Sequence, residues 1–131
     1  MAVLIDTDLL IDLERGDAAV EALLGEEERA ISVITVSELL HGTLRTRGAA
    51  RARRLAFVEH LLASLQAIPI TEPVARIHAE IWSGLAERGE PVGAHDLWIA
   101  ATAVAHGLAV ATRNGSHFRR IPGLRVITAT A

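Results

Sequence analysis

The feature that most constrains this chain is a set of short, unbroken apolar runs separated by stretches with helical spacing. The runs lack the alternation of apolar and polar residues that is typical of a strand with one solvent-exposed face. We therefore expect strands that are covered on both faces, as in a parallel sheet. Most of the runs contain β-branched residues. They occupy Val3–Asp6, Ala30–Thr35, Leu65–Ile70, Leu108–Thr112 and Arg125–Ile127.

Helical patterns fill the segments between these runs, and several of them stop at a glycine, which is a common C-terminal signal of helices. Strands that alternate with helices along a chain indicate an α/β domain. We predict a single domain over residues 1–131 with a central, mostly parallel sheet. The predicted helices are Leu9–Arg15, Ala18–Leu24, Val36–His41, Ala50–Leu65, Pro73–Arg88 and Asp96–His106.

The composition narrows the class of protein. Half of the 131 residues are hydrophobic and 22% are charged, as in a globular domain, and there is no cysteine. The absence of cysteine excludes disulfides, thiolate zinc sites and cysteine nucleophiles. Asp6 and Asp8 interrupt the first apolar run and no basic residue precedes it, so we expect no signal peptide. No apolar segment approaches the roughly 20 residues that cross a bilayer, and we expect a cytoplasmic protein without membrane contact.

The basic residues are unusual because all 13 are arginine. A chain without lysine cannot form a P-loop, a nuclease site with a catalytic lysine, or a haloacid-dehalogenase-type phosphatase site. The net charge of −3 argues against a protein that coats nucleic acid. One basic cluster, RTRGAARARR at 45–54, is either a solvated loop and helix start or a rim that binds phosphate. For the second reading the candidate RNA-binding residues are Arg45, Arg47 and Arg113.

Four polar residues lie where ligands bind in open α/β sheets, beyond the carboxyl ends of the strands. Asp6 closes the first run, Glu38 lies in the first turn of the helix after Ala30–Thr35, and Asp96 begins the helix before Leu108–Thr112. Asn114 follows that last strand. Converging carboxylates repel one another, and a hard divalent cation such as Mg²⁺, or alternatively Mn²⁺, relieves the repulsion. Metal-assisted hydrolysis of a phosphodiester is the chemistry that such a site supports.

The segments that carry these acids resemble the motifs of PIN-domain ribonucleases and, more closely, of the VapC toxins of bacterial toxin–antitoxin pairs. LIDTDLLIDLERG, ISVITVSELLHG and HDLWIAATAVAHGLAVATRN follow one another in the order of the family. With the helices between them, the resemblance covers essentially the whole chain. DLWIAATA followed by ATRN is quite specific, whereas IDT alone is not.

The resemblance implies an α/β/α sandwich and a Mg²⁺- or Mn²⁺-dependent endoribonuclease. Asp6 and Asp96 match the metal-binding aspartates of the family, and Glu38 matches its glutamate as a metal ligand or a base that orients water. Family members commonly carry an acid before the Phe of the last motif, where this chain has His117. Asn114 is the polar residue that remains in that motif, with a supporting catalytic role.

The resemblance also implies partners. The substrate would be structured RNA such as transfer or ribosomal RNA, and the partner would be a VapB-like antitoxin that binds DNA. Homodimers are usual in such toxins, and Trp82 and Trp98 suit either a core or a dimer interface. His95 and His117 flank the proposed site, where either could contact phosphate.

Three other readings remain open for these residues. A PIN-like module for binding or assembly, catalytically weak or inactive, would explain the missing fourth acid. A metal-dependent phosphatase for small molecules is a further alternative. The acids can also have purely structural roles. Asp8 and Asp96 can cap the N-termini of the helices that follow them, and Glu38 can interact favourably with the positive end of a helix dipole.

Overall fold

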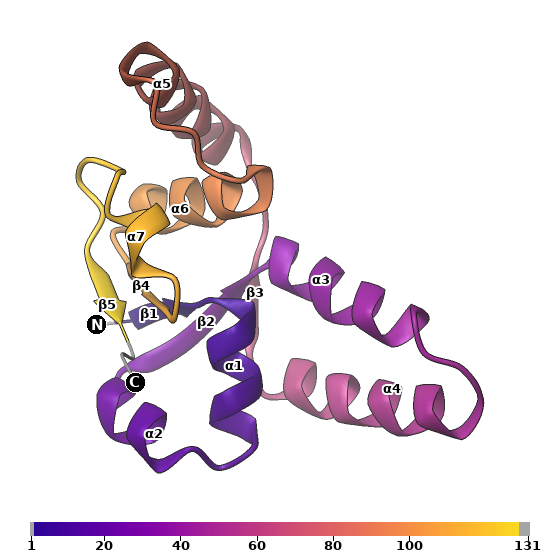
Figure 1. The fold of residues 1–131 in the computed structure, drawn as a ribbon. Helices are drawn as coiled ribbons and strands as arrows, with labels where there is room; N and C mark the ends of the chain where they lie inside the picture. The colour runs from indigo at the N-terminus through magenta and orange to yellow at the C-terminus, as the bar shows by residue number, and fades with distance from the viewer. Residues whose placement is uncertain (1, 129–131) are drawn as a thin grey trace.

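Five parallel strands form the centre of the protein in a computed structural model that describes residues 2–128. The sheet has the order β3-β2-β1-β4-β5, so that β1 lies in the middle with β2 on one side and β4 on the other. Figure 1 shows this sheet edge-on between layers of helices. The strands are β1 (Ala2–Ile5), β2 (Glu28–Ser32), β3 (Gln66–Ile68), β4 (Ala109–Thr112) and β5 (Val126–Thr128).

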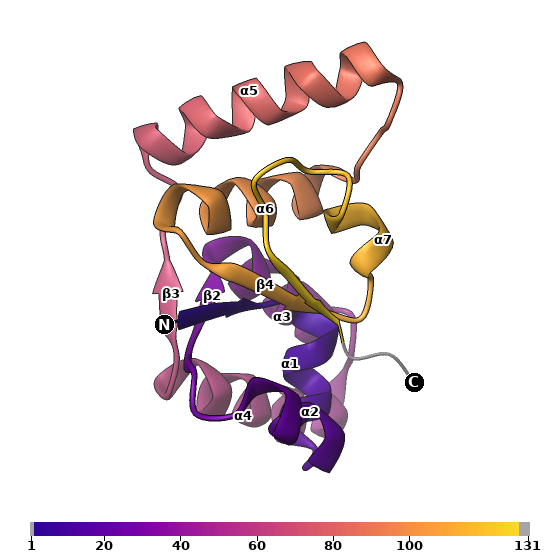
Figure 2. The same cartoon turned by 90° about the vertical axis from the view of Figure 1, so that its left-hand side faces the viewer.

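The helices cover both faces of the sheet, which gives the expected α/β/α sandwich (Figures 1 and 2). One layer contains α5, α6 and α7, and the other contains α1 and α2. The α3–α4 pair projects from the body as an arm. The helices are α1 (Thr7–Glu14), α2 (Ala18–Leu24), α3 (Val33–Leu44), α4 (Gly48–Ala63), α5 (Glu72–Arg88), α6 (Ala94–His106) and α7 (Gly115–Phe118).

Consecutive residues of the strands pack into two separate cores, one on each face of the sheet. Leu4 and Val110 pack with residues of α5 and α6, whereas Val3, Ile5 and Ala111 pack with residues of α1 to α4. All five of these side chains are fully buried. A strand that is buried on both faces has no polar positions to alternate with, which explains the unbroken apolar runs and confirms the predicted parallel sheet.

The predicted elements correspond to observed ones, with the largest error at the junction of β2 and α3. The sequence predicted a strand that continues to Thr35 and a helix from Val36, but the strand ends at Ser32 and the helix begins at Val33. The side chain of Ser32 accepts a hydrogen bond from the backbone N–H of Ile34 at 3.0 Å. This N-cap starts the helix inside a β-branched stretch, so a local cap overrides residue propensity.

Both predicted aspartate caps are wrong. The side chain of Asp96 is not used as a helix cap and lies at the rim of the sheet. The cap of α1 is Asp6, not Asp8, because the Asp6 Oδ1 accepts from the backbone N–H of Thr7 at 2.9 Å. Helix α6 begins at Ala94 after Gly93, and its N-cap makes no side-chain hydrogen bond. Asp96 therefore lies in the first turn and does not cap the helix.

The short helix α7 was not predicted, and it contributes to the packing of the edge strand β5. A Cβ atom added at Gly115 would overlap the Thr128 Cγ2 in β5 and would lie 3.0 Å from the Arg119 Nη1. No described helix between residues 2 and 128 is long and apolar enough to cross a membrane.

Gly115→Ala is expected to destabilise the fold by about 1–3 kcal/mol because Thr128, and with it the end of β5, must move. Gly84→Ala is the matched control, since a Cβ there meets only the flexible end of Arg88 within α5. That control should gain roughly 0.5–1 kcal/mol from the better helix propensity of alanine. Urea denaturation of both variants measures the difference, and equal midpoints would contradict the packing described for α7.

Candidate active site

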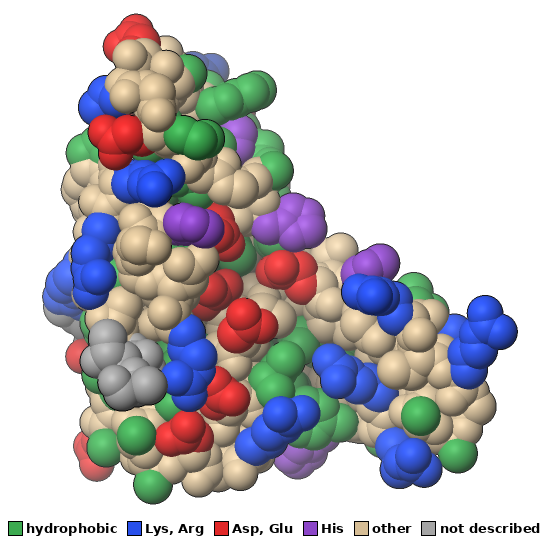
Figure 3. All heavy atoms as spheres, viewed as in Figure 1, with side chains coloured by type: hydrophobic (Ala, Val, Ile, Leu, Met, Phe, Trp, Pro, Cys, Tyr) green, Lys and Arg blue, Asp and Glu red, His purple; other side chains and the backbone are tan. Residues whose placement is uncertain are grey.

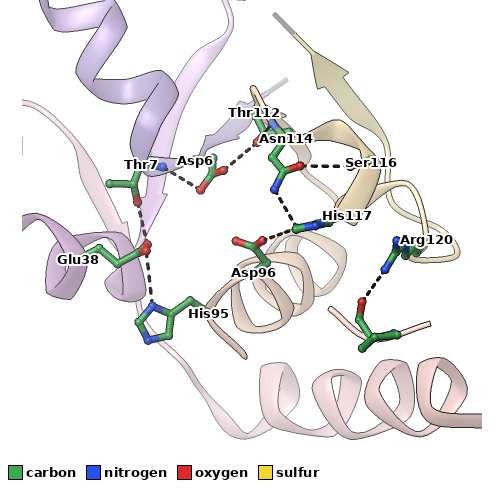
Figure 4. A network of polar contacts seen from close by, with 11 residues as sticks. Asp6, Thr7, Glu38, His95, Asp96, Thr112, Asn114, Ser116, His117 and Arg120 are labelled. Atoms are coloured by element: carbon green, nitrogen blue, oxygen red, sulfur yellow. Dashed lines mark hydrogen bonds and ion pairs between the residues drawn. The ribbon is translucent and has the colours of Figure 1, made fainter. Parts of the chain in front are cut away.

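The candidate site lies at the carboxyl ends of β1 and β4, the two strands between which the direction of chain progression reverses. Ligands of open α/β sheets bind in the crevice at this kind of switch point. Here the residues after the two strands and the first turn of α6 bring Asp6, Asn114 and Asp96 together, and α3 adds Glu38 (Figure 4). They line a hollow of about 400 Å³ whose full lining is Asp6, Thr7, Asp8, Ile11, Glu38, Leu39, Arg54, Asp96 and Asn114.

Asp6 accepts a hydrogen bond at each of its carboxylate oxygens. The hydroxyl of Thr112 donates to its Oδ2 at 2.8 Å, and the backbone N–H of Thr7 donates to its Oδ1. Burial raises the pKa of Asp6 above its ordinary value, and the negative charges of Asp96 and Glu38 raise it further. The two hydrogen bonds lower the pKa and offset part of this shift. Asp6 is thus a half-buried carboxylate that lies beside two other negative charges.

Glu38 approaches the hollow from the opposite side, on the second turn of α3. Its Oε1 accepts a hydrogen bond from the Thr7 hydroxyl at 2.8 Å, and its Oε2 lies 3.5 Å from the Nδ1 of His95. Thr7 also contacts the hydroxyl of Thr35 at 3.2 Å. Glu38 is therefore held between α1 and the start of α6, with both carboxylate oxygens oriented.

Asp96, His117 and Asn114 form a second group of contacts across the hollow (Figure 4). The His117 Nδ1 lies 3.3 Å from the Asp96 Oδ2 and 2.8 Å from the Asn114 Nδ2, while the Ser116 hydroxyl donates to the Asn114 Oδ1. One ring nitrogen either donates or accepts, so Nδ1 can serve only one of its two neighbours at a time. His117 thus lies against a carboxylate at the position where the resemblance led us to expect another acid.

The hydroxyls of Thr7 and Thr112 were not singled out by sequence reasoning. Each orients a carboxylate of the site, and Thr112 in addition accepts from the backbone N–H of Asn114 at 2.9 Å. The sequence contains no pattern that identifies either threonine as part of the site. The contact of Thr112 with Asp6 depends on the pairing of β1 with β4, and that of Thr7 with Glu38 depends on how α1 lies beside α3.

The three arginines predicted to bind RNA have different surroundings. Arg45 lines a neighbouring hollow of about 460 Å³ together with Glu38 and His95. Arg47 is the exposed residue immediately before α4. Arg113 is hydrogen-bonded to Asp12 and Asp17, which neutralise its charge. The arginine in the lining of the main hollow is Arg54, which belongs to the same basic cluster but had not been selected.

The charges of this face suit a cation at the centre and an anion around it. In the space-filling view, acidic side chains run down the middle of the face and arginines lie on both sides of them (Figure 3). In the described part of the chain, no three Asp, Glu, His or Cys side chains are arranged to enclose a metal ion as they stand. The fit of a cation rests instead on the convergence of Asp6, Glu38 and Asp96 on one hollow. Burial, and to a smaller extent the charges of the other two carboxylates, raise the pKa of Asp6 there. Carboxylate oxygens are the ligands that Mg²⁺ and Mn²⁺ prefer.

Comparisons with known proteins identify the relatives of this chain. The sequence model of the PIN domain matches residues 3–124. Ribonuclease VapC1 of Rickettsia felis is 34% identical over all of this chain and 98% of its own length. The tRNA(fMet)-specific endonuclease VapC of Salmonella typhimurium is 37% identical over 79% of this chain and 76% of its own. The crystal structure of VapBC-5 from Mycobacterium tuberculosis, of the VapBC family of toxin–antitoxin systems, matches with a TM-score of 0.79. That match has 32% identity and covers 99% of this chain and 98% of the other.

Proposed function

This chain belongs to the PIN domain family, among the VapC ribonucleases, and on that premise we propose that it is a toxin that hydrolyses RNA with the help of a divalent cation. The observation that carries the proposal is the hollow at the switch point of the sheet, where Asp6, Glu38 and Asp96 converge from three separate segments. A catalytically inactive binding module has no need for three converging carboxylates, one of which has a pKa raised by burial and by the charges of the other two.

Asp6 and Asp96 are the residues that would hold the cation, which we propose to be Mg²⁺, with Mn²⁺ as the alternative. When bound, the cation supplies positive charge to a phosphoryl oxygen and so stabilises the charge that develops on the phosphate. Thr112 and the backbone N–H of Thr7 fix the direction of the Asp6 carboxylate. This fixed direction lowers the entropic cost of ligation, because one ligand is already oriented.

Glu38 is placed to orient and deprotonate the attacking water. Its Oε1 is held by Thr7, and its Oε2 faces the hollow beside His95 (Figure 4). A carboxylate held in this way accepts a proton in a fixed direction, which is what general base catalysis requires. Asn114 supports the opposite wall through its contacts with His117 and Ser116.

The relatives suggest the partners of this chain. The Salmonella typhimurium relative is a tRNA(fMet)-specific endonuclease, and the Mycobacterium tuberculosis structure belongs to a toxin–antitoxin system. We therefore propose transfer RNA as the first substrate to test and a VapB-like antitoxin as the cognate partner. A homodimer is proposed as well, because Trp82, Leu44 and Leu55 expose large apolar side chains that an assembly would cover.

The test compares classes of substrate for the purified, antitoxin-free chain. With Mg²⁺ present, it should cut total transfer RNA into discrete products and should release no phosphate from small phosphate esters. Chelation of the metal should stop the cutting. Phosphate release without RNA cleavage would favour a small-molecule phosphatase. If the chain catalyses neither reaction, the result would favour a binding module.

A further inference from the structure

Arg54 on α4 is a cation at the edge of the acidic hollow, and it has no ion-pair partner among the described residues. Its Nε is buried and has no hydrogen-bond acceptor among residues 2–128, and no described carboxylate pairs with its guanidinium. Arg29, Arg76 and Arg113, by contrast, each form an ion pair with a carboxylate. The guanidinium of Arg54 therefore carries a positive charge that no described ion pair offsets.

The position of Arg54 links two hollows of opposite charge. It lines the acidic hollow that contains Asp6 and Asp96. It also lines a second hollow of about 340 Å³ with Arg15, Thr46, Ala50, Arg53 and Phe57. Its guanidinium lies against α3 where Gly42 has no side chain, since a Cβ there would be 3.3 Å from the Arg54 Nη2.

An RNA substrate requires such a cation near the centre of the site. The carboxylates of the acidic hollow repel a polyanion, so the attraction that holds RNA must come from cations beside them. A single strand carries one phosphate per nucleotide, and the phosphates next to the cut bond must therefore lie close to the acidic hollow. A free guanidinium is well suited to bind phosphate because its planar N–H fork matches the phosphate oxygens.

We propose that Arg54, together with Arg53 and Arg15, forms a subsite for the backbone phosphate adjacent to the one that is cut. The strand would then run from the acidic hollow into the second hollow, between α1 and α4. This inference rests on the proposed ribonuclease function and extends it by naming where the substrate strand is held. It concerns a phosphate contact and therefore does not require the metal.

The experiment measures binding and cleavage separately. A short fluorescent single-stranded RNA of mixed sequence is titrated with wild type, Arg54→Gln and Arg54→Lys in chelator, over a range of salt concentrations. Arg54→Gln should bind about tenfold more weakly. The slope of its log affinity against log salt should be shallower by about 0.7. Arg54→Lys keeps the charge, so it should keep the wild-type slope and lose less affinity. Arg76→Gln is the matched control, because it removes an exposed arginine on α5 and should bind like wild type.

Equal affinity and slope for wild type and Arg54→Gln would overturn the subsite, as would a wild type that binds no RNA in chelator. If Arg54→Gln bound RNA like the wild type but bound a purified antitoxin more weakly, the subsite would also be overturned. Arg54 would then be a residue that pairs with a carboxylate of the antitoxin. Cleavage of total transfer RNA by the wild type in Mg²⁺ is run beside these titrations. A wild type that cuts RNA while Arg54→Gln binds normally contradicts only the subsite, whereas a wild type that cuts no RNA contradicts the proposed function itself.

Discussion

Asp96→Asn is expected to reduce RNA cleavage by at least about 100-fold, because it removes one of the two carboxylates proposed to hold the cation. Loss of groups that only support metal ligands already costs about 10–100-fold. The fold should be nearly unaffected, since Asp96 does not cap α6. The loss of a first-turn acid should cost at most about 1 kcal/mol of stability. Initial rates of transfer RNA cleavage at saturating Mg²⁺ and thermal unfolding measure the two quantities.

Glu80→Gln is the control for this experiment, because it removes one negative charge from an exposed position of α5. It should cut RNA at the wild-type rate. If Asp96→Asn retained wild-type activity while Glu80→Gln behaved as expected, Asp96 would not be a metal ligand. A large drop in the unfolding temperature of Asp96→Asn would instead identify Asp96 as a structural residue.

Asp6→Asn is expected to abolish cleavage and yet to stabilise the chain at neutral pH in the absence of metal. Burial and the charges of Asp96 and Glu38 raise the pKa of Asp6 above 3.8, so the folded state binds the proton more tightly than the unfolded state. The contribution of Asp6 to the stability of the wild type should therefore fall as the pH rises from 3.8 through the folded pKa. Asparagine carries no charge, remains a good N-cap for α1, and can donate from its amide to the Thr112 hydroxyl.

Thermal unfolding in chelator between acidic and neutral pH tests this stability difference. The unfolding temperature of Asp6→Asn should exceed that of the wild type at neutral pH, and the difference should shrink as the pH falls. Added Mg²⁺ should raise the unfolding temperature of the wild type much more than that of the variant, since a ligand stabilises only the state that binds it. A variant that is less stable than the wild type at neutral pH would contradict the electrostatic cost assigned to Asp6.

Much of the fold could be predicted because the pattern that encodes it is local. Helix α2 has the predicted bounds, and the apolar runs at Val3–Asp6 and Leu108–Thr112 became the central pair β1 and β4. The error after Ser32 has a physical cause, since one backbone N–H donating to the Ser32 hydroxyl starts a helix at three residues with strand-like composition, Val33, Ile34 and Thr35. Asp8 was predicted as the cap of α1 where the structure has Asp6, because an aspartate at either position can cap a helix equally well in isolation.

The acidic residues of the candidate site could be predicted from the sequence, but the residues that support them could not. Asp6, Glu38 and Asp96 follow from strand ends and from the motifs, and the structure brings all three to one hollow. Which arginine of the basic cluster faces that hollow depends on how α4 packs on α3, and this tertiary contact has no signature in the sequence. The contact of His117 with Asp96 likewise depends on α7, which was not predicted.

Metal-dependent cleavage of RNA can be tested directly. The purified chain is given total transfer RNA, and the cleavage rate is measured before chelation, after chelation and after Mg²⁺ is returned. We expect discrete products with Mg²⁺, no cleavage in chelator, and full recovery when the cation is restored. Cleavage that continues undiminished in chelator would contradict the assignment of Asp6 and Asp96 as metal ligands. An absence of cleavage with both Mg²⁺ and Mn²⁺ would contradict the proposal that this chain is a ribonuclease.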